Sequence, residues 1–548
     1  MYRTITLILM AAGVGQALAA EPVLRQPSTD VFAISGVRIV TSPGQVIESG
    51  TVVVRDGVIE AVGSDVDVPA DATVHEHDPE EAALTLYPGL IDAYVPVAFA
   101  SDDDDGNNDD DEEAETYRPG QYPHPLITPG RTMTSKRWPA DKVEALRNAG
   151  FTMAVLVPEQ GLVRGRSALV SLGEGSFGAN VIEPELFQHV SLNARMSGRH
   201  FPSSLMGGMA LLRQAFMDAR WQAEARSVWR DNPGQRRPEF LEGVEPLESV
   251  LAGDVPVVFD ADDMLDSLRV AGLVEEFGLS AWIVGHGSEY QRLDSLAAVG
   301  LGQILPLDFP SAPDVDEDAE REVSLQELRH WHNAPENPSR VLESGLDMLL
   351  TSHPHSSPGN LFEHLEKAIE RGLDADRALA ALTTGPAEVL GIADRAGRLE
   401  AGYMANFLLV EDDLFVASPT IREVWVDGRR HLLREMEPPE VEPAGQWDIE
   451  LIVAGMGSID ASLTLRGEAP TLSGSMEIMG TNLPLSEARV SGSRLDLRID
   501  GSRLGMPGSF NMYMDIEDDR GRGAGSSPQG DFNVRGRRTG DPDQEDSA

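Results

Sequence analysis

The chain lacks cysteine altogether and is poor in basic residues. Without cysteine, its 548 residues can form neither disulfide bonds nor metal sites built on thiolates. Its 44 Lys and Arg face 90 Asp and Glu, which gives a formal net charge of −46 at pH 7 and a pI of about 4.5. Such a charge repels a phosphate backbone, so we do not expect nucleic acid as a partner. The acidic excess favours solubility, and an acidic surface that attracts cationic ligands is the alternative.

Apolar runs of membrane-spanning length are also missing. The first 20 residues, MYRTITLILMAAGVGQALAA, contain Arg3, an apolar run from about Ile5 to Val14, and then Ala17 and Ala19 in a small-x-small pattern. The run is far shorter than the ~20 residues of a spanning helix, and the whole pattern is typical of a secretory signal. We therefore expect a signal peptide cleaved near Ala19 and a mature protein that is periplasmic or secreted, without a membrane span.

Several catalytic motifs are absent as well. The chain has no Gly-x-Ser-x-Gly elbow, no phosphate-binding lysine loop and no His-Glu-x-x-His. The stretch GEGSFG at 173–178 matches the glycine pattern of dinucleotide sites. However, the residues after it do not open a convincing helix, and the phosphate site needs that helix N-terminus. We interpret 173–178 as a turn and expect no nucleotide cofactor.

The predicted pattern of secondary structure changes near Pro88. Residues 31–76 indicate short strands, with β-branched residues between Gly and Asp turns. After Pro88, short apolar runs alternate with helical patterns, which predicts a parallel sheet, open or closed. The segment from Pro88 to His353 is close to the roughly 250 residues typical of an eight-fold barrel. From about Gln446 onward, strands recur at roughly ten-residue spacing, as in an all-β barrel or sandwich.

Two stretches carry a resemblance to a known family. YPGLIDAYVPV at 87–97 resembles the first barrel strand of the amidohydrolase superfamily, normally Pro-Gly-Leu-Ile-Asp-Ala-His-x-His. ALAALTTGPAEVLGIADRAGRLEAGYMANFLLVEDDLF at 378–415, followed by VWVDGRR, resembles the C-terminal segment of that superfamily, where the chain leaves the barrel. The resemblance covers about residues 30–433 and is to an imidazolonepropionase-like, secreted subgroup.

The resemblance implies an α/β fold in which a TIM-like (β/α)8 barrel is flanked by a small composite β-sandwich. A C-terminal all-β module follows. We predict the following segments: 1–20 signal peptide; 21–86 N-terminal part of the β-sandwich; 87–395 barrel, with an acidic loop at 101–115; 396–433 C-terminal part of the β-sandwich; 434–445 linker; 446–537 antiparallel β module; and 538–548 disordered tail.

The resemblance also implies where a metal would bind. In the family, two first-strand histidines hold a divalent metal together with residues from the fourth, fifth, sixth and eighth strands. The metal lowers the pKa of a bound water from ~15.7 toward ~7. Here Tyr94 and Pro96 occupy the two histidine positions. Proline has no donor atom, and a phenol with a pKa near ~10 is a poor ligand. We therefore expect no metal in the family's geometry, and the catalytic residues remain unknown.

Three other residues are candidates for a relocated site. By the resemblance, Asp260 stands at the fifth-strand position, His286 at the sixth and His353 at the eighth, where an aspartate is usual. All three would lie at the C-terminal ends of strands, the face where barrel enzymes place their sites. Three such ligands are enough for one catalytic zinc, and His355 lies two residues further on. The alternative is that they are ordinary polar residues at the opening of a site that no longer binds a metal.

Three weaker patterns complete the candidates. The x-spaced pairs His75/His77 and His330/His332 have no carboxylate partner assembled by spacing. The acidic run SDDDDGNNDDDEE at 101–113 comes close to a calcium loop, but Ser101 stands at its first position. Its composition favours a solvated, disordered loop.

Two functions follow from these observations. The first is a protein that keeps the barrel and a binding or scaffold role, for an unknown small molecule or protein partner, after losing its chemistry. The second is an exported hydrolase of non-peptide C–N bonds, of the cyclic amide type, that uses a rearranged single-metal site with zinc. Because function is set by the site rather than by the fold, the replaced ligands favour the first.

Overall fold

The computed structural model describes residues 31–540 except for 77–83, 98–121, 134–137, 193–200, 203, 313–322, 356, 412, 434–439, 454–456, 468, 470–471, 479, 501–508 and 528–529. The predicted signal peptide, the acidic loop at 101–115 and residues 541–548 lie outside the described residues, and so does His77. The expectations for export and for calcium therefore remain predictions.

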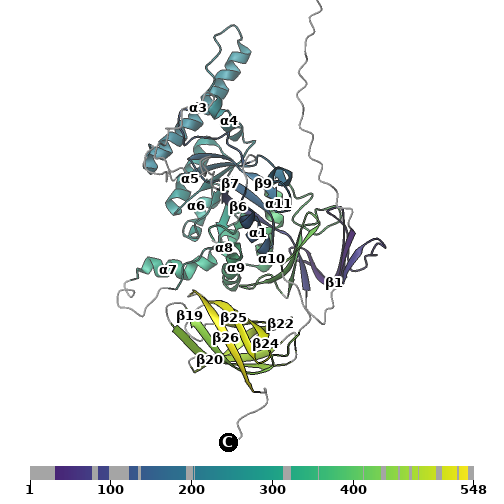
Figure 1. Ribbon diagram of the computed structural model, residues 1–548. Helices are drawn as coiled ribbons and strands as arrows, with labels where there is room; N and C mark the ends of the chain where they lie inside the picture. Colours follow the sequence, from purple (N-terminus) through teal and green to yellow (C-terminus); the bar gives the residue numbers. More distant parts are fainter. Residues whose placement is uncertain are drawn as a thin grey trace, which may run out of the picture.

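The strands before the α/β region and the strands after it form one eight-stranded sheet (Figure 1). β5 at the end of the first group pairs antiparallel with β16 of the second, with Leu86 opposite Leu409. The sheet is thus composite, as the resemblance implied. Its strands are β1 (Val31–Ser42), β2 (Gln45–Arg55), β3 (Val58–Gly63), β4 (Thr73–Glu76), β5 (Leu84–Pro88), β16 (Phe407–Glu411), β17 (Thr420–Val426) and β18 (Arg429–Leu432).

An aromatic cluster fills the interior of this sheet. Trp425 is fully buried and stacks on Phe407, with ring centroids 5.3 Å apart. His75, one of the x-spaced histidines, lies 6.0 Å from the rings of both Phe32 and Trp425. His75 therefore packs as part of this cluster, and among the described residues it belongs to no group of three side chains whose ligand atoms are close enough for one ion.

Between these two groups of strands lies a mixed α/β region with two sheets. In one sheet β6 (Leu90–Val97) and β7 (Phe151–Pro158) run parallel. In the other, five successive parallel strands form a row: β11 (Gln188–Ser191), β12 (Val257–Asp260), β13 (Ala281–Val284), β14 (Gly302–Pro306) and β15 (Met348–Thr351). All seven are short and almost wholly buried, as parallel strands covered by helices are.

Three antiparallel strands depart from the predicted regular barrel. β9 (Ala168–Ser171) pairs with β7, β10 (Val181–Glu183) pairs with β9, and β8 (Val163–Arg166) pairs with β11. A parallel crossover needs a connection of about a dozen residues or more, whereas only 159–162 separate β7 from β8 and only Ser167 separates β8 from β9. The connection 159–167 between β7 and β9 is thus too short for such a crossover, and β9 runs antiparallel to β7. The described ladders therefore form a sheet of four strands and a sheet of six.

Helices cover these sheets, and one of them projects from the molecule. α5 (Met264–Phe277) begins where Asp263 caps the Asp266 amide, and it ends at Gly278 in the left-handed conformation, φ +69°. α3 (Leu205–Asp231) projects beyond the α/β region (Figure 1). The other helices are α1 (Ala140–Asn148), α2 (Phe177–Asn180), α4 (Glu245–Leu251), α6 (Leu293–Ala297), α7 (Leu325–Asn333), α8 (Asn337–Glu343), α9 (Leu361–Glu370), α10 (Ala375–Leu382) and α11 (Thr384–Val389). Over the described residues, none of the helices has both the length and the apolar character to cross a membrane.

The C-terminal module is a closed antiparallel barrel that lies beside the α/β region (Figure 1). β19 closes it by pairing with β20 on one side and with β26 on the other. Apolar side chains on alternate positions fill the interior, with Trp447 and Met514 at its centre. Its strands are β19 (Gly445–Val453), β20 (Gly457–Arg466), β21 (Ser473–Ile478), β22 (Thr481–Ser491), β23 (Arg494–Asp500), β24 (Ser509–Glu517), β25 (Arg520–Ser527) and β26 (Gly530–Gly540).

Two details at the edges of this barrel differ from the predicted segments. β26 continues to Gly540, so the prediction of a disordered tail is wrong for 538–540, where Arg538 pairs with Trp447 in the ladder. Within the predicted linker, the Glu440 amide donates to Gly492 and the Pro443 carbonyl accepts from the Trp447 indole. These backbone contacts attach the described end of the linker to the barrel.

Candidate functional site

A buried aspartate joins the two sheets of the α/β region where β6 approaches β15. Asp92 is fully buried, and its carboxylate accepts from the Tyr94 amide at 3.0 Å and from the Thr351 hydroxyl at 2.7 Å. The Ser352 amide and hydroxyl donate to its other oxygen at 3.1 and 2.5 Å. Burial raises the pKa of Asp92, and these hydrogen bonds oppose that rise. The aspartate of PGLIDA thus serves the fold, since all four of its partners are structural.

Beside Asp92, the side chain of Tyr94 is tied to two residues from other strands. Its hydroxyl donates to the Asp260 carboxylate, with oxygen–oxygen distances of 2.9 and 3.0 Å. Arg164, on β8, donates to the same carboxylate and lies 3.3 Å from the Tyr94 hydroxyl. The side chains of Arg164 and Asp260 are only 11% and 18% exposed. The three residues therefore form one buried, charge-neutral group, which we call the Tyr94–Asp260–Arg164 triad.

The charges of the triad explain its protonation. Burial raises the pKa of Tyr94 well above its usual value, and the negative charge of Asp260 raises it further. The phenol therefore stays protonated and remains a donor. For Arg164, burial opposes the charged form, but Asp260 and Tyr94 outweigh it and the pKa is raised. The guanidinium consequently supplies a permanent positive charge at this point.

Two histidines flank the ring of Tyr94. The His189 ring, on β11, lies 6.0 Å from it and the His353 ring 5.5 Å. His189 is buried, and among the described residues neither of its ring nitrogens has a hydrogen-bond partner. Burial and the charge of Arg164 lower its pKa well below the usual value. Burial is also the main reason that the pKa of His353 is lowered. Both rings are thus neutral at pH 7.

The third candidate ligand, His286, makes a different set of contacts. Its Nδ1 lies 2.7 Å from the Ser288 hydroxyl and its Nε2 lies 3.4 Å from the Ser267 hydroxyl. Its backbone amide donates to the buried carboxylate of Glu289 at 2.6 Å. Glu289 in turn accepts from Asn337 at 2.6 Å. His286 therefore belongs to a polar network around α5 and α8, whereas Asp260 and His353 both lie near Tyr94.

The triad does not suit the divalent metal that the fold family implies. Both oxygens of Asp260 already accept hydrogen bonds from Tyr94, and one also pairs with a guanidinium. Pro96 offers no ligand atom. Over the described residues, the only group of three side chains with ligand atoms close enough for one ion is Asp308, His355 and His364. Asp260, His286 and His353 do not form such a group.

The remaining histidine pair lies on an exposed helix. His330 and His332 occupy the last turn of α7, where His332 is exposed. The His330 ring stacks on Tyr290, with centroids 6.2 Å apart. Cationic or dipolar side chains near a helix C-terminus interact favourably with the last carbonyl groups. This pair is therefore explained by its position on the helix.

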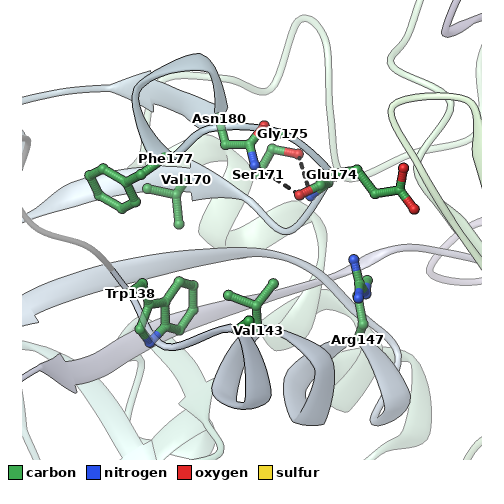
Figure 2. A pocket seen from close by; sticks show the side chains of 11 residues that line it. Trp138, Val143, Arg147, Val170, Ser171, Glu174, Gly175, Phe177 and Asn180 are labelled. Carbon is green, nitrogen blue, oxygen red and sulfur yellow. Dashed lines mark hydrogen bonds between the residues drawn. The ribbon is translucent and has the colours of Figure 1, made fainter.

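A cavity of about 270 Å³ lies between α1 and the segment that follows β9. Figure 2 shows Trp138 and Phe177 at one end of it, and Arg147 and Glu174 at the other. The GEGSFG stretch forms part of its wall, with bends at Glu174 and Gly175. The prediction of a turn over 173–178 is wrong for Phe177 and Gly178, which open the short helix α2. The Asn180 side chain on that helix donates to the Gly173 carbonyl at 2.8 Å. The cavity thus has an apolar end and a charged end.

Sequence reasoning missed Arg164, His189 and the partners of Asp92. Arg164 lies in an alternating Val-Arg-Gly-Arg stretch whose pairing with β11 is not visible in the sequence. His189 stands in the apolar run FQHVSL, where a polar residue inside a buried strand was the available signal. Sequence reasoning considered the ligand positions that the resemblance implies, and Arg164 and His189 were missed because they lie outside those positions.

Comparison with known proteins agrees with the resemblance. The model of an amidohydrolase family matches residues 354–431. The chain is 33% identical over 113 residues to an adenine deaminase from Moorella thermoacetica, which covers 19% of this chain and 18% of the relative. It is 23% identical over 409 residues to amidohydrolase tasK of Hapsidospora irregularis, covering 69% and 39%. The chain thus spans well under half the length of these curated relatives.

A solved structure shows the same fold. The crystal structure of an amidohydrolase from Thermotoga maritima MSB8 superposes with a TM-score of 0.57 at 19% sequence identity, covering 74% of this chain and 100% of that one. At this identity the likeness concerns the fold alone. Together with the family match at 354–431, it makes the chain similar to amidohydrolases in fold and in this segment of its sequence.

Proposed function

We propose that this chain is an exported amidohydrolase-superfamily protein that is catalytically impaired and retains a binding or scaffold role. The observation that carries the proposal is the triad. Tyr94 and Asp260 stand at two family ligand positions, and here they bind each other and Arg164. The Arg164 guanidinium thus pairs with Asp260 where a metal ion from solution would otherwise bind.

Electrostatics explains why the two cations exclude each other. Two unit charges ~4 Å apart at an effective dielectric constant of ~20 interact with roughly 4 kcal/mol. A divalent ion beside the Arg164 guanidinium therefore meets repulsion of roughly twice that size. It would also have to break the bonds between Asp260 and the Tyr94 hydroxyl. Water activation by a metal at this position is consequently disfavoured.

The arrangement of the strands supports one opening at their C-terminal ends, which we call the mouth. We infer that β6, β7 and β11–β15 surround it as in a (β/α)8 barrel, with β9 added to the first group and β8 to the second. The hydrogen bonds from Thr351 and Ser352 to Asp92 connect the outer strands β15 and β6. Asp260 and Arg164 then reach Tyr94 from the other side of the mouth.

The binding role is supported by the cavity between α1 and β9. Its apolar end, with Trp138 and Phe177, suits an aromatic or aliphatic group, and the Arg147 guanidinium at its other end suits an anionic group. We infer a small amphipathic ligand with a carboxylate. The role predicts that a panel of small aromatic carboxylates contains ligands that alter Trp138 fluorescence.

Binding at this cavity is tested by titrating the panel against wild-type protein, Arg147→Gln and Trp138→Phe. Arg147→Gln should weaken binding at least tenfold, and Trp138→Phe should abolish the signal while leaving thermal stabilisation by the ligand. An exposed arginine outside the cavity, Arg466→Gln, is the matched control. Unchanged affinity in Arg147→Gln would refute binding at this place.

The alternative is an active hydrolase of non-peptide C–N bonds, of the cyclic amide type, with zinc at a rearranged single-metal site. The names of the matched relatives, a deaminase and an amidohydrolase, favour it. So does the position of His353 near Tyr94 and Asp260. Hydrolysis would then require Asp260 to exchange Arg164 for a metal.

Hydrolysis assays separate the two functions. Full-length protein, dialysed and then supplied with Zn²⁺ or Mn²⁺, is tested on cyclic amides beside Asp260→Asn and the matched exposed control Asp254→Asn. Catalytic impairment predicts no metal-dependent hydrolysis in any of the three. Metal-dependent turnover that Asp260→Asn removes and Asp254→Asn keeps would establish the hydrolase instead.

A further inference from the structure

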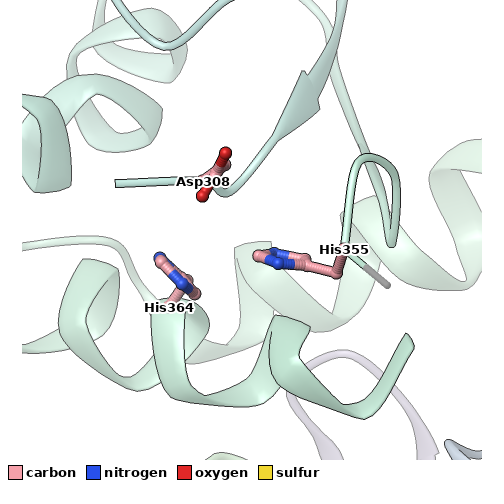
Figure 3. A group of neighbouring side chains, drawn as sticks. All are labelled: Asp308, His355 and His364. Carbon is pink, nitrogen blue, oxygen red and sulfur yellow. The ribbon is translucent and has the colours of Figure 1, made fainter. Parts of the chain in front are cut away.

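The geometry points to a second polar centre in this protein: a divalent transition-metal site formed by Asp308, His355 and His364. Asp308 follows β14, His355 follows β15, and His364 lies on α9. Figure 3 shows the three side chains directed toward one another from these separate elements. None of the three stands at a position that the family resemblance assigns to a metal ligand.

The distances between the ligand atoms suit a single ion. One ligand atom from each residue lies within 4.8 Å of the other two. Two imidazoles and one carboxylate are a common ligand set for zinc, and imidazole also suits copper and nickel. Three protein ligands leave a fourth position open for water or a small ligand. Because the chain carries a net charge of −46, cations are also attracted to its surface in general.

His355 is already oriented as a ligand. Its Nε2 lies 2.9 Å from the Leu307 carbonyl oxygen, so Nε2 must carry the proton and donate. In the neutral ring, Nδ1 then holds the free lone pair. Metal-binding histidines usually donate their other N–H to a carbonyl or carboxylate, which fixes both the tautomer and the ring orientation. Leu307 precedes Asp308, so one loop holds both ligands in place.

In His364, as in His355, Nδ1 is the ring nitrogen that carries the lone pair. The Phe309 amide donates to its Nδ1 at 3.0 Å, and therefore Nδ1 is the unprotonated nitrogen of the neutral ring. The two imidazoles lie with centroids 4.9 Å apart. A metal bound at Nδ1 would replace the Phe309 amide as the partner of this atom. Binding should consequently shift the backbone at Phe309, next to Asp308.

Asp308 completes the group as an accessible carboxylate. Its side chain is exposed, and over the described residues it makes no hydrogen bond and no ion pair. This differs from Asp260, whose oxygens are all engaged with Tyr94 and Arg164. An incoming cation can therefore bind Asp308 without breaking an existing bond of that side chain.

The experiment titrates tag-free, dialysed full-length protein with Zn²⁺ by calorimetry and with Co²⁺ by visible absorption. Wild-type protein should bind one ion per chain, and Co²⁺ should give the intense bands of a tetrahedral site. Asp308→Asn, His355→Ala and His364→Ala should each weaken binding at least tenfold. His332→Ala removes an exposed histidine and should leave the affinity unchanged.

Two further variants keep the test decisive. His364→Gln retains an acceptor for the Phe309 amide but removes the imidazole, so ligand loss is separated from misfolding, which circular dichroism monitors. Asp260→Asn should leave Zn²⁺ binding unchanged, which makes this test independent of the proposed loss of catalysis. The inference is overturned if no stoichiometric binding occurs, if His355→Ala and His364→Gln bind as wild type does, or if Asp260→Asn abolishes binding.

Discussion

The triad and the group of Asp308, His355 and His364 contain similar side chains but differ in how their polar atoms are used. In the triad, the Asp260 carboxylate is saturated by Tyr94 and Arg164. In the second group, the Asp308 carboxylate has no partner over the described residues. From this difference we expect the second group, rather than the triad, to accept a cation, because only the Asp308 carboxylate is without a partner among the described residues.

The largest expected effect tests this contrast between the two aspartates. Asp260→Ala leaves the Arg164 guanidinium buried without its counter-charge and should lower the free energy of unfolding by about 3 kcal/mol. Asp308→Ala breaks no bond of its side chain and should change it by less than about 0.5 kcal/mol. Urea unfolding measures both values. Equal losses of stability in the two variants would contradict the proposed difference between Asp260 and Asp308.

A double variant tests whether Arg164 and Asp260 act as a coupled pair. Arg164→Met combined with Asp260→Leu removes both charges together and replaces them with apolar groups of similar length. Breaking one partner of a buried pair is costly, whereas replacing both is often nearly neutral. The double variant should therefore recover most of the ~3 kcal/mol lost in Asp260→Ala. A loss equal to the sum of the two single variants would contradict a coupled pair.

The next effect concerns Asp92, which joins β6 to β15. Asp92→Ala leaves the Tyr94 and Ser352 amides and the Ser352 hydroxyl without the carboxylate that accepts from them, and it should destabilise the protein by about 2–3 kcal/mol. Urea unfolding measures the loss, and the exposed Asp141→Ala on α1 serves as control. If the two variants unfold alike, Asp92 does not hold the strands together.

A smaller effect depends on pH through His189. Because its pKa in the folded protein lies below the value of ~6.5 in the unfolded chain, its contribution is fully present above pH ~6.5 and is lost as the pH falls below it. One proton taken up on unfolding corresponds to about 1.4 kcal/mol per pH unit. His189→Phe should reduce the slope of stability between pH 6.5 and 5 by up to that amount, and His332→Gln should not. Parallel slopes in all three proteins would contradict the buried, neutral ring.

The smallest effect is that of a single hydroxyl. Tyr94→Phe removes one hydrogen bond to Asp260 but leaves its ion pair with Arg164, and it should cost about 1 kcal/mol. Thermal unfolding is sensitive enough to measure it. The same variant should not gain affinity for Zn²⁺, because the guanidinium remains. Tight Zn²⁺ binding by Tyr94→Phe would show that Tyr94 alone excluded the metal.

Parts of the fold follow from local patterns, and other parts do not. The strand–helix alternation after Pro88 predicted a parallel sheet with helices between its strands, as α1, α5 and the parallel strands β12–β15 show, because periodicity and caps are local signals. The spacing of the last strands predicted an all-β module, but its closure through the β19–β26 pairing is a long-range contact. The antiparallel pairings of β8 with β11 and of β9 with β7 were missed because a short buried run carries no signal of strand direction.

The site was less predictable than the fold. The replacement of the metal ligands by Tyr94 and Pro96 is visible in the sequence, and so are Asp260 and His353 near them. The identity of their partners is not, because Arg164 lies in an unremarkable Val-Arg-Gly-Arg stretch and reaches Asp260 only through the pairing of β8 with β11. The proximity of His364 to His355 likewise depends on where α9 lies relative to the loop that follows β15.

The position of Arg164 on β8 has a consequence for the conditions in which its charge is present. Because the guanidinium is part of the chain, its charge does not depend on the supply of trace elements, and chelators cannot extract it. For the same reason, we expect Tyr94→His combined with Pro96→His to bind no divalent metal at this place unless Arg164 is replaced as well.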